Sequence, residues 1–557
     1  MKTRLRDAVQ QVLTQCYAEK LLLSGEMPDF AIEVPGRVDH GDFAVNVAMM
    51  LARAEKKAPR QIAQTVVEKL EEVQEEVGLW KKVEIAGPGF INFFLHARCW
   101  YAVLDDIYAQ HETFGRSEVG RGRRVQVEFV SANPTGPLHI GHGRGAATGD
   151  AVAAVLQEAG FEVQREYYVN DAGNQMDTLG RSIYLRYCQL HGQQVDFPED
   201  CYQGDYINDL AKQAQSADGD KYLHQSQQEA VSYFSSFGGG IIKAGIDDDL
   251  LSFGIKFDNW YSEQSLYDRG LVKAGIEALT REGYTYEQDD AVWFRTTDFG
   301  DDKDRVLVRS NGVTTYFASD VAYHREKYER GFDTVIDVWG ADHHGYVPRM
   351  KAVLAALGRN PEDLQVVLVQ LVNLLRDGEQ IAMSTRAGKF VTLKEVIDEV
   401  GSDACRFFFL MRRSDSKLDF DLELAKKQST ENPVFYVQYA HARVCSINRN
   451  AQDAGLQLPT AAMVNLELLQ LPEELALAKL LSRYPEVIVG AALEHEPHRV
   501  TFYLQELAAK FHSYYNQHRV VIDDVATSSA RLCLVNAVRI VLANALRVLG
   551  VSAPEKM

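Results

Sequence analysis

The sequence predicts an α/β protein built around a doubly wound parallel sheet. Between about 117 and 425, segments rich in β-branched residues alternate with segments of helical period, which is typical of a parallel sheet covered by helices. The expected strands span 124–130, 163–169, 333–338 and 366–375. Mixed patterns precede this region and helical patterns alone follow it. Because 557 residues are too many for one core, we expect three domains: 1–116, 117–425 and 426–557.

The composition is that of an ordinary folded protein, with 46% hydrophobic and 25% charged residues. Seven scattered cysteines, never spaced Cys-x-x-Cys, argue against a disulfide framework and a zinc knuckle, and they fit a reducing cytoplasm. We see no apolar leader and no run long enough to cross a bilayer, so no membrane association is expected. The net charge of −19 lowers the expectation of a nucleic-acid partner, but a large protein can still present a local basic face.

The first 116 residues predict an α+β domain. The expected elements are helices at 5–23 and 59–73 and strands at 83–86 and 90–95, the strands flanking the turn 87–89. The loop 37–43 is expected to expose Phe43 among polar residues. That loop is either a connection leading into a helix or a base-stacking surface for nucleic acid.

The sheet is expected to be interrupted by an insertion between its two halves. Residues 190–250 are polar and helical, with breaks at 198–200 and at the glycine run 238–240. Segments 292–297 and 305–311 predict a hairpin at the edge of the second half of the sheet.

The last 130 or so residues, from about 426, predict a helical bundle. Its final helix carries an apolar stripe that ends at Gly550. The residues of this stripe are Val535, Val538, Leu542, Ala545 and Leu549.

The most informative segment is 127–142, where an apolar strand runs into a Gly/Pro-rich turn and then into His139-Ile140-Gly141-His142. Gly141 leaves room for a flat base, and the amides that open the following helix, 142–159, favour an anion. His139 and His142 can donate to the same phosphate. A metal site is the alternative, but no third and fourth ligands lie nearby at recognisable spacing.

Two further loops suit the same nucleotide. Trp339-Gly340-Ala341-Asp342-His343 follows a predicted strand, so that Gly340 permits close approach and Asp342 accepts from a ribose or an adenine. The loop Met383-Ser384-Thr385-Arg386, continuing to Lys389, combines small polar residues with two cations and suits a clamp over a triphosphate. Each loop alone also fits an ordinary connection. Three such loops at the carboxyl ends of parallel strands favour a nucleotide site.

Taken together, these motifs resemble those of a class I aminoacyl-tRNA synthetase with a Rossmann-type catalytic domain, and specifically those of the arginyl-tRNA synthetase family. The resemblance covers nearly the whole chain. Besides His139-Ile140-Gly141-His142 it includes Glu128 and Asn133, Tyr168 to Gln175, Tyr316 to Asp320, Tyr436 to Arg443, Gly41-Asp42-Phe43, Gly87 to Asn92 and the ending Leu549 to Met557.

The resemblance implies that arginine and ATP, bound with Mg²⁺, give arginyl-adenylate and pyrophosphate, and that the arginyl group then passes to the 3′ end of tRNA(Arg). It implies a catalytic role for His139 and His142. The implied ATP site adds Gly141, Gly340, Asp342, His343, Met383, Ser384 and Arg386. The implied arginine site contains Glu128, Asn133, His139, Tyr316, Asp320 and Asp342, and a guanidinium requires such carboxylates. The expected tRNA contacts are Phe43, Tyr436, Arg443, Arg449 and Arg519. We expect a monomer without zinc.

One departure from the family pattern stands out. The usual Lys-Met-Ser-Lys-Ser signature is replaced by Ala382-Met383-Ser384-Thr385-Arg386, and no compensating lysine precedes His139. The alternatives that remain are another class I synthetase of the cysteinyl or glutamyl type, a tRNA-binding paralogue without catalysis, and a nucleotidyltransferase that makes a small metabolite.

Overall fold

The computed structural model describes residues 1–381 and 391–557, apart from the side chain of Val38. The described chain forms two compact units. The larger comprises 115–443, 484–508 and 542–557, and the smaller comprises 1–114, 444–483 and 509–541. The division into three domains stays a prediction.

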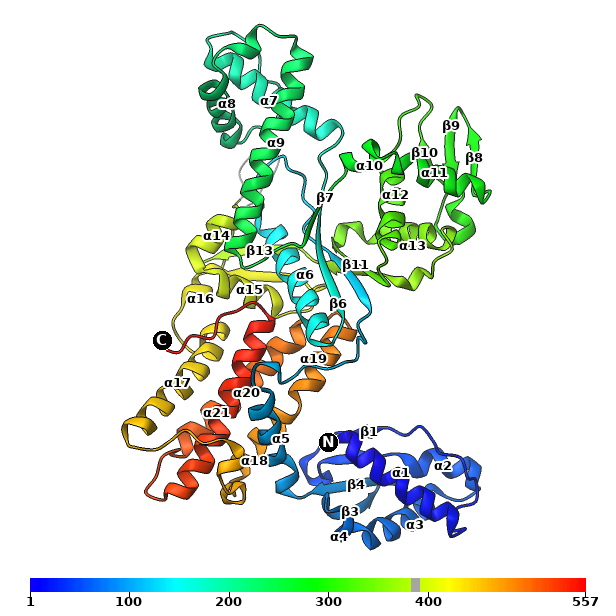
Figure 1. The fold of residues 1–557 in the computed structure, drawn as a ribbon, viewed down its shortest axis with the longest axis vertical. Helices are drawn as coiled ribbons and strands as arrows, with labels where there is room; N and C mark the ends of the chain where they lie inside the picture. The colour runs from blue at the N-terminus through cyan, green and yellow to red at the C-terminus, as the bar shows by residue number, and fades with distance from the viewer. Residues whose placement is uncertain (382–390) are drawn as a thin grey trace. The chain divides into compact units, whose positions relative to one another are not determined.

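A five-stranded parallel sheet lies at the centre of the larger unit (Figure 1). Its order is β12 (Leu364–Val369), β11 (Thr334–Gly340), β5 (Arg124–Glu128), β6 (Glu162–Val169) and β7 (Asn259–Ser262). From β5 the chain builds outward through β6 to β7, and it then returns to the other side of β5 through β11. This change of direction places a topological switch point at the carboxyl ends of β5 and β11, where ligands of doubly wound sheets bind. The predicted fold class is confirmed.

The predicted strand 366–375 is wrong as a single element. It is two strands, because β12 ends at Val369 and β13 (Val372–Arg376) belongs to another sheet. In that sheet β13 runs parallel to β15 (Leu418–Asp421) and antiparallel to β14 (Glu379–Gln380). The backbone of Gln370 turns out of the first sheet, since its N–H donates to the carbonyl of Ser414 at 2.8 Å. The apolar sequence 366–375 is continuous and gives no sign of this break, because the break depends on a hydrogen bond to Ser414, which is distant in sequence.

The predicted insertion is helical, but it lies between the neighbouring strands β6 and β7, within one half of the sheet, and its expected place between the two halves is wrong. It consists of α7 (Asn174–Leu190), α8 (Asp205–Asp218) and α9 (Gln227–Ser252). The predicted break at the glycine run is wrong, because all three glycines lie inside α9. They serve packing instead: a Cβ on Gly238 would lie 2.3 Å from Ile183 Cδ1 of α7.

Helices and a small antiparallel sheet make up the rest of the larger unit. The predicted hairpin is confirmed as β9 (Ala291–Phe294) and β10 (Arg305–Val308). Its expected place at the edge of the parallel sheet is wrong, because with β8 (Thr285–Gln288), which the sequence did not reveal, it forms a separate three-stranded sheet. The helices are α6 (Ile140–Glu158), α10 (Gln264–Asp268), α11 (Leu271–Arg281), α12 (Tyr316–Glu329), α13 (Val347–Ala356), α14 (Leu393–Val400), α15 (Ser402–Leu410) and α16 (Leu422–Lys426).

In the smaller unit, residues 1–114 form the expected α+β fold. The predicted elements are α1 (Lys2–Ala18), α3 (Pro59–Glu72), β3 (Trp80–Ala86) and β4 (Phe90–Leu95), and the others are β1 (Ile32–Glu33), β2 (Phe43–Val45), α2 (Val47–Glu55), α4 (Gln74–Val77) and α5 (Ala97–Gln110). The expectation that Phe43 is exposed is wrong. Phe43 begins β2, is only 4% exposed, and stacks on Trp100 of α5 with ring centroids 5.7 Å apart. It therefore offers no surface to a base.

The helices after residue 432 are α17 (Pro433–Asp453), α18 (Pro472–Ser482), α19 (Tyr484–Leu493), α20 (His498–Gln517) and α21 (Val525–Val548). The predicted apolar stripe of α21 is fully buried, and Gly550 follows it with a φ of +66°. In length and composition α21 could cross a membrane, contrary to our expectation for any run of this chain. Its burial is that of a core helix in a bundle.

Candidate active site

The first turn of α6 carries both histidines of the signature. His139 is the N-cap residue, and its Nδ1 accepts from the N–H of Gly141 at 3.1 Å. The Nδ1 of His142 accepts in turn from the N–H of His139 at 3.2 Å, and the two rings stack with centroids 3.7 Å apart. Because Nδ1 of each neutral ring accepts, the ring proton sits on Nε2. Each histidine therefore presents an Nε2–H donor.

Both rings are held neutral. Burial lowers the pKa of His139, and burial together with the neighbouring His139 lowers the pKa of His142 to about 3. Over the physiological range these side chains donate hydrogen bonds without adding charge. The amides of the same helix end supply the partial positive charge that favours phosphate.

Two glycines allow this arrangement. A Cβ on Gly141 would lie 2.9 Å from His139 Cε1, so the absent side chain makes room for the folded-back imidazole. The sequence analysis explained the glycine at position 141 by the approach of a nucleotide base, whereas the structure explains it by the position of the His139 ring. A Cβ on Gly143 would lie 2.5 Å from Leu393 Cδ1, which shows how closely the chain after residue 390 packs on α6.

Asp320 and Tyr316 share one face of α12, as their spacing of four predicts. Tyr316 is 53% exposed, whereas the Asp320 carboxylate is turned inward and accepts a hydrogen bond from Tyr346. Burial raises the pKa of Asp320 to about 6, and the negative charges of Glu128 and Asp337 add to this effect. An acid in such surroundings is stabilised in its charged form by a bound cation.

Glu128 lies at the carboxyl end of β5 but is already engaged. Its Oε2 accepts from Nζ of Lys327 at 2.5 Å, and its Oε1 accepts from the hydroxyl of Ser131 at 2.8 Å. Lys327 is fully buried on α12 and also reaches Asp337 at 2.8 Å. Each oxygen of Glu128 therefore has one donor, and since a carboxylate has further acceptor positions, the expected contact with the guanidinium stays a prediction.

The sequence analysis missed Glu263, the residue directly after β7. Its side chain is 3% exposed, and within the described chain its Oε2 has no hydrogen-bond partner. Burial and the charge of Asp320 raise the pKa of Glu263 to about 7. A buried carboxylate with an unused oxygen needs an explanation, and a cationic ligand supplies one. The only sequence signal was a glutamate directly after a strand.

The second loop lies at the carboxyl end of β11. Gly340 is its last strand residue, and Asp342 and His343 follow in an exposed short helix with His343 Nε2 and Asp342 Oδ2 3.6 Å apart. A Cβ on Gly340 would lie 2.5 Å from Asp342 Oδ1, so the glycine lets that carboxylate fold over the strand end. Asn133, in the loop after β5, donates to Gln175 at the start of α7.

The third loop lies outside the described residues, including Met383, Ser384, Arg386 and Lys389. Among the described residues no group of three or more His, Cys, Asp or Glu side chains is placed to hold a metal ion.

Four of the five expected tRNA contacts lie on or near the surface of the helical region, in two different units. Tyr436 and Arg443 are partly buried on α17 in the larger unit, where Arg443 stacks on Tyr439 at 4.5 Å. Arg449 is partly buried farther along α17, and Arg519 is exposed after α20, both in the smaller unit. Phe43 is excluded by its burial.

Comparison with known proteins agrees with this geometry. The models that match are the arginyl-tRNA synthetase N-terminal domain over 3–95, the catalytic domain of class I (R) tRNA synthetases over 104–418 and the DALR anticodon-binding domain over 437–557. The arginine–tRNA ligases of Syntrophotalea carbinolica and Citrifermentans bemidjiense are 68% and 60% identical, each match covering 100% of both chains. The solved arginyl-tRNA synthetase of Thermus thermophilus, 23% identical, shows the same fold with a TM-score of 0.71 over 100% of both chains. The chain therefore belongs to the arginyl-tRNA synthetase family of class I.

Proposed function

We propose that this chain, an ATP-dependent arginine–tRNA ligase like its family, holds the guanidinium of arginine between the carboxylates of Asp320 and Glu263. The observation that carries the proposal is the pair of inward-facing acids with raised pKa values, one of which has an unused oxygen. A guanidinium offers five N–H donors in one plane and keeps its charge at any physiological pH. It therefore satisfies the spare acceptors and returns both acids to their ionised form.

Other side chains complete the amino-acid site in this proposal. Tyr316, His139 and Asn133 border the pocket from α12, α6 and the loop after β5, and Asp342 faces it from the end of β11. Glu128 belongs to this site as well, because its negative charge adds to the raised pKa of Asp320 while one of its oxygens pairs with the buried Lys327.

The chemistry needs no nucleophile from the protein. A carboxylate oxygen of arginine attacks the α-phosphorus of ATP, an O–P bond forms, and pyrophosphate leaves with the electron pair of the broken bond. A ribose hydroxyl at the 3′ end of tRNA then attacks the arginyl carbonyl, loses its proton, and AMP leaves. We infer that the Nε2–H groups of His139 and His142 and the amides of α6 stabilise charge on the phosphates.

The remaining assignments are proposals of the same kind. Gly141, Gly340, Asp342 and His343 border the nucleotide, which binds as its Mg²⁺ complex, and Met383, Ser384 and Arg386 approach its phosphates. Tyr436, Arg443, Arg449 and Arg519 contact tRNA(Arg) through its backbone or bases. We also propose a monomer that works in the cytoplasm away from membranes, which the burial of α21 supports.

Arginine binding to three variants tests the pocket. Asp320→Asn and Glu263→Gln each remove one partner of a desolvated charge pair, which costs about 2 to 5 kcal/mol. Calorimetry should show arginine affinity falling at least about thirtyfold in both. Glu329→Gln is the matched control, because Glu329 is an exposed acid on the same helix, paired with Arg325. Unchanged affinity in the two pocket variants would overturn the assignment.

A further inference from the structure

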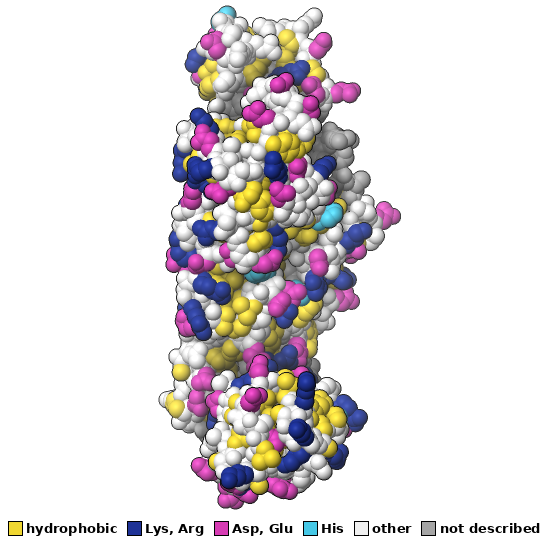
Figure 2. All heavy atoms as spheres, turned by 90° about the vertical axis from the view of Figure 1, so that its right-hand side faces the viewer, with side chains coloured by type: hydrophobic (Ala, Val, Ile, Leu, Met, Phe, Trp, Pro, Cys, Tyr) yellow, Lys and Arg dark blue, Asp and Glu magenta, His cyan; other side chains and the backbone are white. Residues whose placement is uncertain are grey.

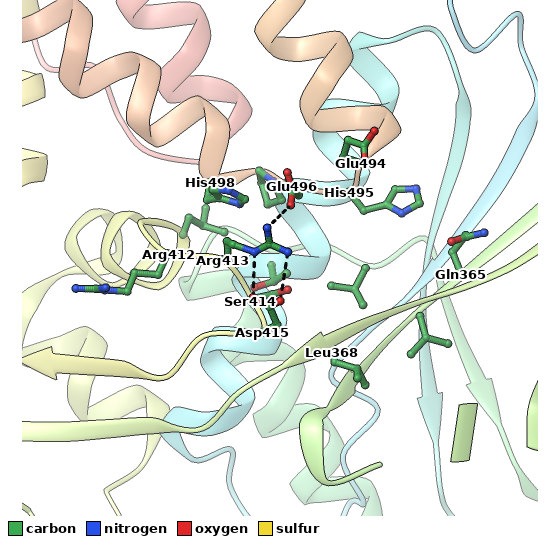
Figure 3. A pocket seen from close by; sticks show the side chains of 15 residues that line it. Gln365, Leu368, Arg412, Arg413, Ser414, Asp415, Glu494, His495, Glu496 and His498 are labelled. Carbon is green, nitrogen blue, oxygen red and sulfur yellow. Dashed lines mark hydrogen bonds and ion pairs between the residues drawn. The ribbon is translucent and has the colours of Figure 1, made fainter. Parts of the chain in front are cut away.

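Surface charge and the cavity beside β12 do not point to a further ligand. Acidic and basic side chains are interspersed on the face that Figure 2 shows. The cavity in Figure 3, of about 330 Å³, has Arg413 in its wall, and this cation already pairs with Asp415 at 3.2 Å and with Glu496 at 3.4 Å. The loop that joins β5 to α6 is more informative, because it carries residues of the proposed arginine site.

This loop is long and its backbone is strained. It spans residues 129–139, whereas connections of this kind usually have about two to six residues. Val130 and Ser131 have φ values of +69° and +43°. Both lie in the left-handed region, which is unfavourable for most side chains and especially for a β-branched one. Such a backbone persists only where its surroundings impose it, and it is concentrated at functional sites.

Side chains of the parallel sheet hold the first part of the loop. The hydroxyl of Ser131 donates to Glu128 at 2.8 Å and accepts from the N–H of Tyr168 at 3.1 Å. The hydroxyl of Tyr167 donates to the carbonyl of Ala132 at 2.9 Å. Because both tyrosines belong to β6, these bonds fix the loop to the sheet up to residue 132.

The helical insertion holds the second part of the loop. The hydroxyl of Tyr206, in the first turn of α8, donates to the carbonyl of Thr135 at 2.7 Å. The N–H of Thr135 donates to the carbonyl of Asn133 at 2.8 Å, and the side chain of Asn133 donates to Gln175 of α7. Thr135 therefore links Tyr206 to Asn133 through the backbone.

Two glycines make room for Tyr206. A Cβ on Gly204 would lie 2.4 Å from Cε1 of the tyrosine ring, and a Cβ on Gly136 would lie 3.2 Å from its hydroxyl oxygen. Burial raises the pKa of Tyr206, so that its hydroxyl stays protonated over the physiological range. The side chain is therefore a permanent donor to the loop.

Another tyrosine of the insertion shows what a purely internal hydrogen bond looks like. The hydroxyl of Tyr187 on α7 donates to the carbonyl of Gly219 at 2.5 Å, so that donor and acceptor both belong to the insertion. The hydrogen bond of Tyr206 leaves the insertion and reaches the loop that carries Asn133 and His139. Stability of the insertion does not require such a bond.

We propose that Tyr206 is a positioning residue for arginine binding. By holding Thr135 it keeps Asn133 directed at the amino-acid site, so that the insertion takes part in recognition without touching the substrate. Because Nδ2 of Asn133 donates to Gln175, its Oδ1 serves as the acceptor for an N–H group of arginine. This inference rests on the proposed place of Asn133 in the arginine site.

The test compares Tyr206→Phe with Tyr187→Phe. Each change removes one hydroxyl that donates to a backbone carbonyl, and both residues lie in the insertion, so Tyr187→Phe is a matched control. For each variant one measures the melting temperature and the arginine affinity by calorimetry. Pyrophosphate exchange with saturating ATP and tRNA(Arg) then gives kcat and the arginine KM.

Tyr206→Phe should weaken arginine affinity and raise the arginine KM about three- to tenfold, because the net loss of one hydrogen bond corresponds to a factor of this size. Its kcat should stay within about twofold of the parent. Tyr187→Phe should lower the melting temperature and leave arginine affinity within about twofold.

A double-mutant cycle tests the route from Tyr206 to the substrate. If Tyr206 acts through Asn133, then Tyr206→Phe in an Asn133→Ala background should change arginine affinity less than about twofold. Effects of the two single variants that simply multiply would show that Tyr206 does not act through Asn133, and would overturn the inference.

Three other results would overturn it as well. They are parent-like arginine affinity in Tyr206→Phe, parent-like affinity in Asn133→Ala, and an equal loss of affinity in Tyr187→Phe, since arginine binding would then follow the general stability of the insertion. Failure of the proposed function looks different. The parent protein itself would then show neither arginine binding nor arginine-dependent exchange.

Discussion

The pKa of Asp320 makes arginine affinity depend on pH. A cation favours the ionised carboxylate, so binding expels the proton that Asp320 carries below a pKa of about 6. Glu263, whose pKa is about 7, loses a proton on binding in the same way. Affinity should therefore be level above about pH 8 and should fall as the pH drops through 7 and then 6, approaching about a hundredfold per pH unit below both pKa values. Calorimetry between pH 5 and 8 measures this, and buffers of different ionisation enthalpy report the released proton. A profile that is flat down to pH 5 would contradict it.

Tyr346 affects the pH at which arginine affinity begins to fall. Its hydroxyl donates to Oδ2 of Asp320 and so lowers the pKa of that carboxyl against the opposing effect of burial. Tyr346→Phe should therefore move the acid limb of arginine affinity to higher pH and weaken binding at pH 6.5 more than at pH 8.5. Equal weakening at both pH values would mean that Tyr346 only packs. Tyr328→Phe, at the far end of α12, is the control.

His142 should affect rate and leave folding nearly unchanged. It gives one Nε2–H donor, and loss of a donor used in the transition state costs about 3 to 4 kcal/mol, or a hundred- to a thousandfold in rate. Because its pKa is about 3, the neutral donor persists and the parent rate shows no histidine limb above pH 5. His142→Ala should show the slow exchange with a normal melting temperature. A normal exchange rate together with a lowered melting temperature would instead make His142 a structural residue.

Side chains close together in sequence were predictable, and those brought together by the fold were not. Tyr316 and Asp320 follow from a spacing of four on a helix. The pairing of Glu128 with Lys327 joins residues 199 positions apart, and neither helical nor strand periodicity carries such information. Glu263 was missed for the same reason: its burial and the nearby Asp320 appear only when β7 and α12 lie together.

At the scale of elements, α9 gives a prediction about glycine in a helix. Gly240 is exposed with open space around its Cβ position, whereas a Cβ on Gly238 would meet Ile183 of α7 at 2.3 Å. Gly240→Ala should stabilise α9 by about 0.5 to 1 kcal/mol, through helix propensity alone. Gly238→Ala should destabilise the α7–α9 pair by about 1 to 3 kcal/mol. Hydrogen exchange of the α7 and α9 amides reports each change, and equal protection in both variants would contradict the packing role.

The errors at this scale share a cause. Glycine run 238–240 was read as a break and 366–375 as one strand because local signals were used alone. Contacts with α7 keep the glycines in a helix, and contacts with Ser414 and Arg144 divide the strand. Elements with strong local periodicity were placed well: β6 within one residue at each end, and the end of α21 within two residues.

For the whole molecule, the sequence departure at 382–386 leads to a prediction about tRNA. Without the two usual lysines the loop has less charge with which to hold triphosphate, so we expect tRNA to stabilise the competent state by its differential affinity. Pyrophosphate exchange should then depend on tRNA(Arg). The double variant Arg386→Ala, Lys389→Ala should lower it further. Full exchange without tRNA would refute the dependence, and normal exchange in the double variant would place the compensating cation elsewhere.

The order of elements along the whole chain was largely predictable, because composition and period change near 117 and 426. The assembly of those elements was not. Residues 444–483 and 509–541 group with the N-terminal 114 residues, whereas 484–508 and 542–557 group with the parallel sheet. Packing between elements that are distant in sequence decides such groupings, and periodicity describes single elements only.

The central claim is that a buried pair of carboxylates selects arginine by its charge. The most direct measurement is amino-acid-dependent pyrophosphate exchange with ATP and tRNA(Arg), comparing arginine with citrulline, in which a neutral urea group replaces the guanidinium at nearly the same size. The account predicts exchange with arginine and a loss of at least about a thousandfold in kcat/KM with citrulline, because Asp320 and Glu263 would be left buried without a cation. Comparable exchange with the two amino acids would contradict it.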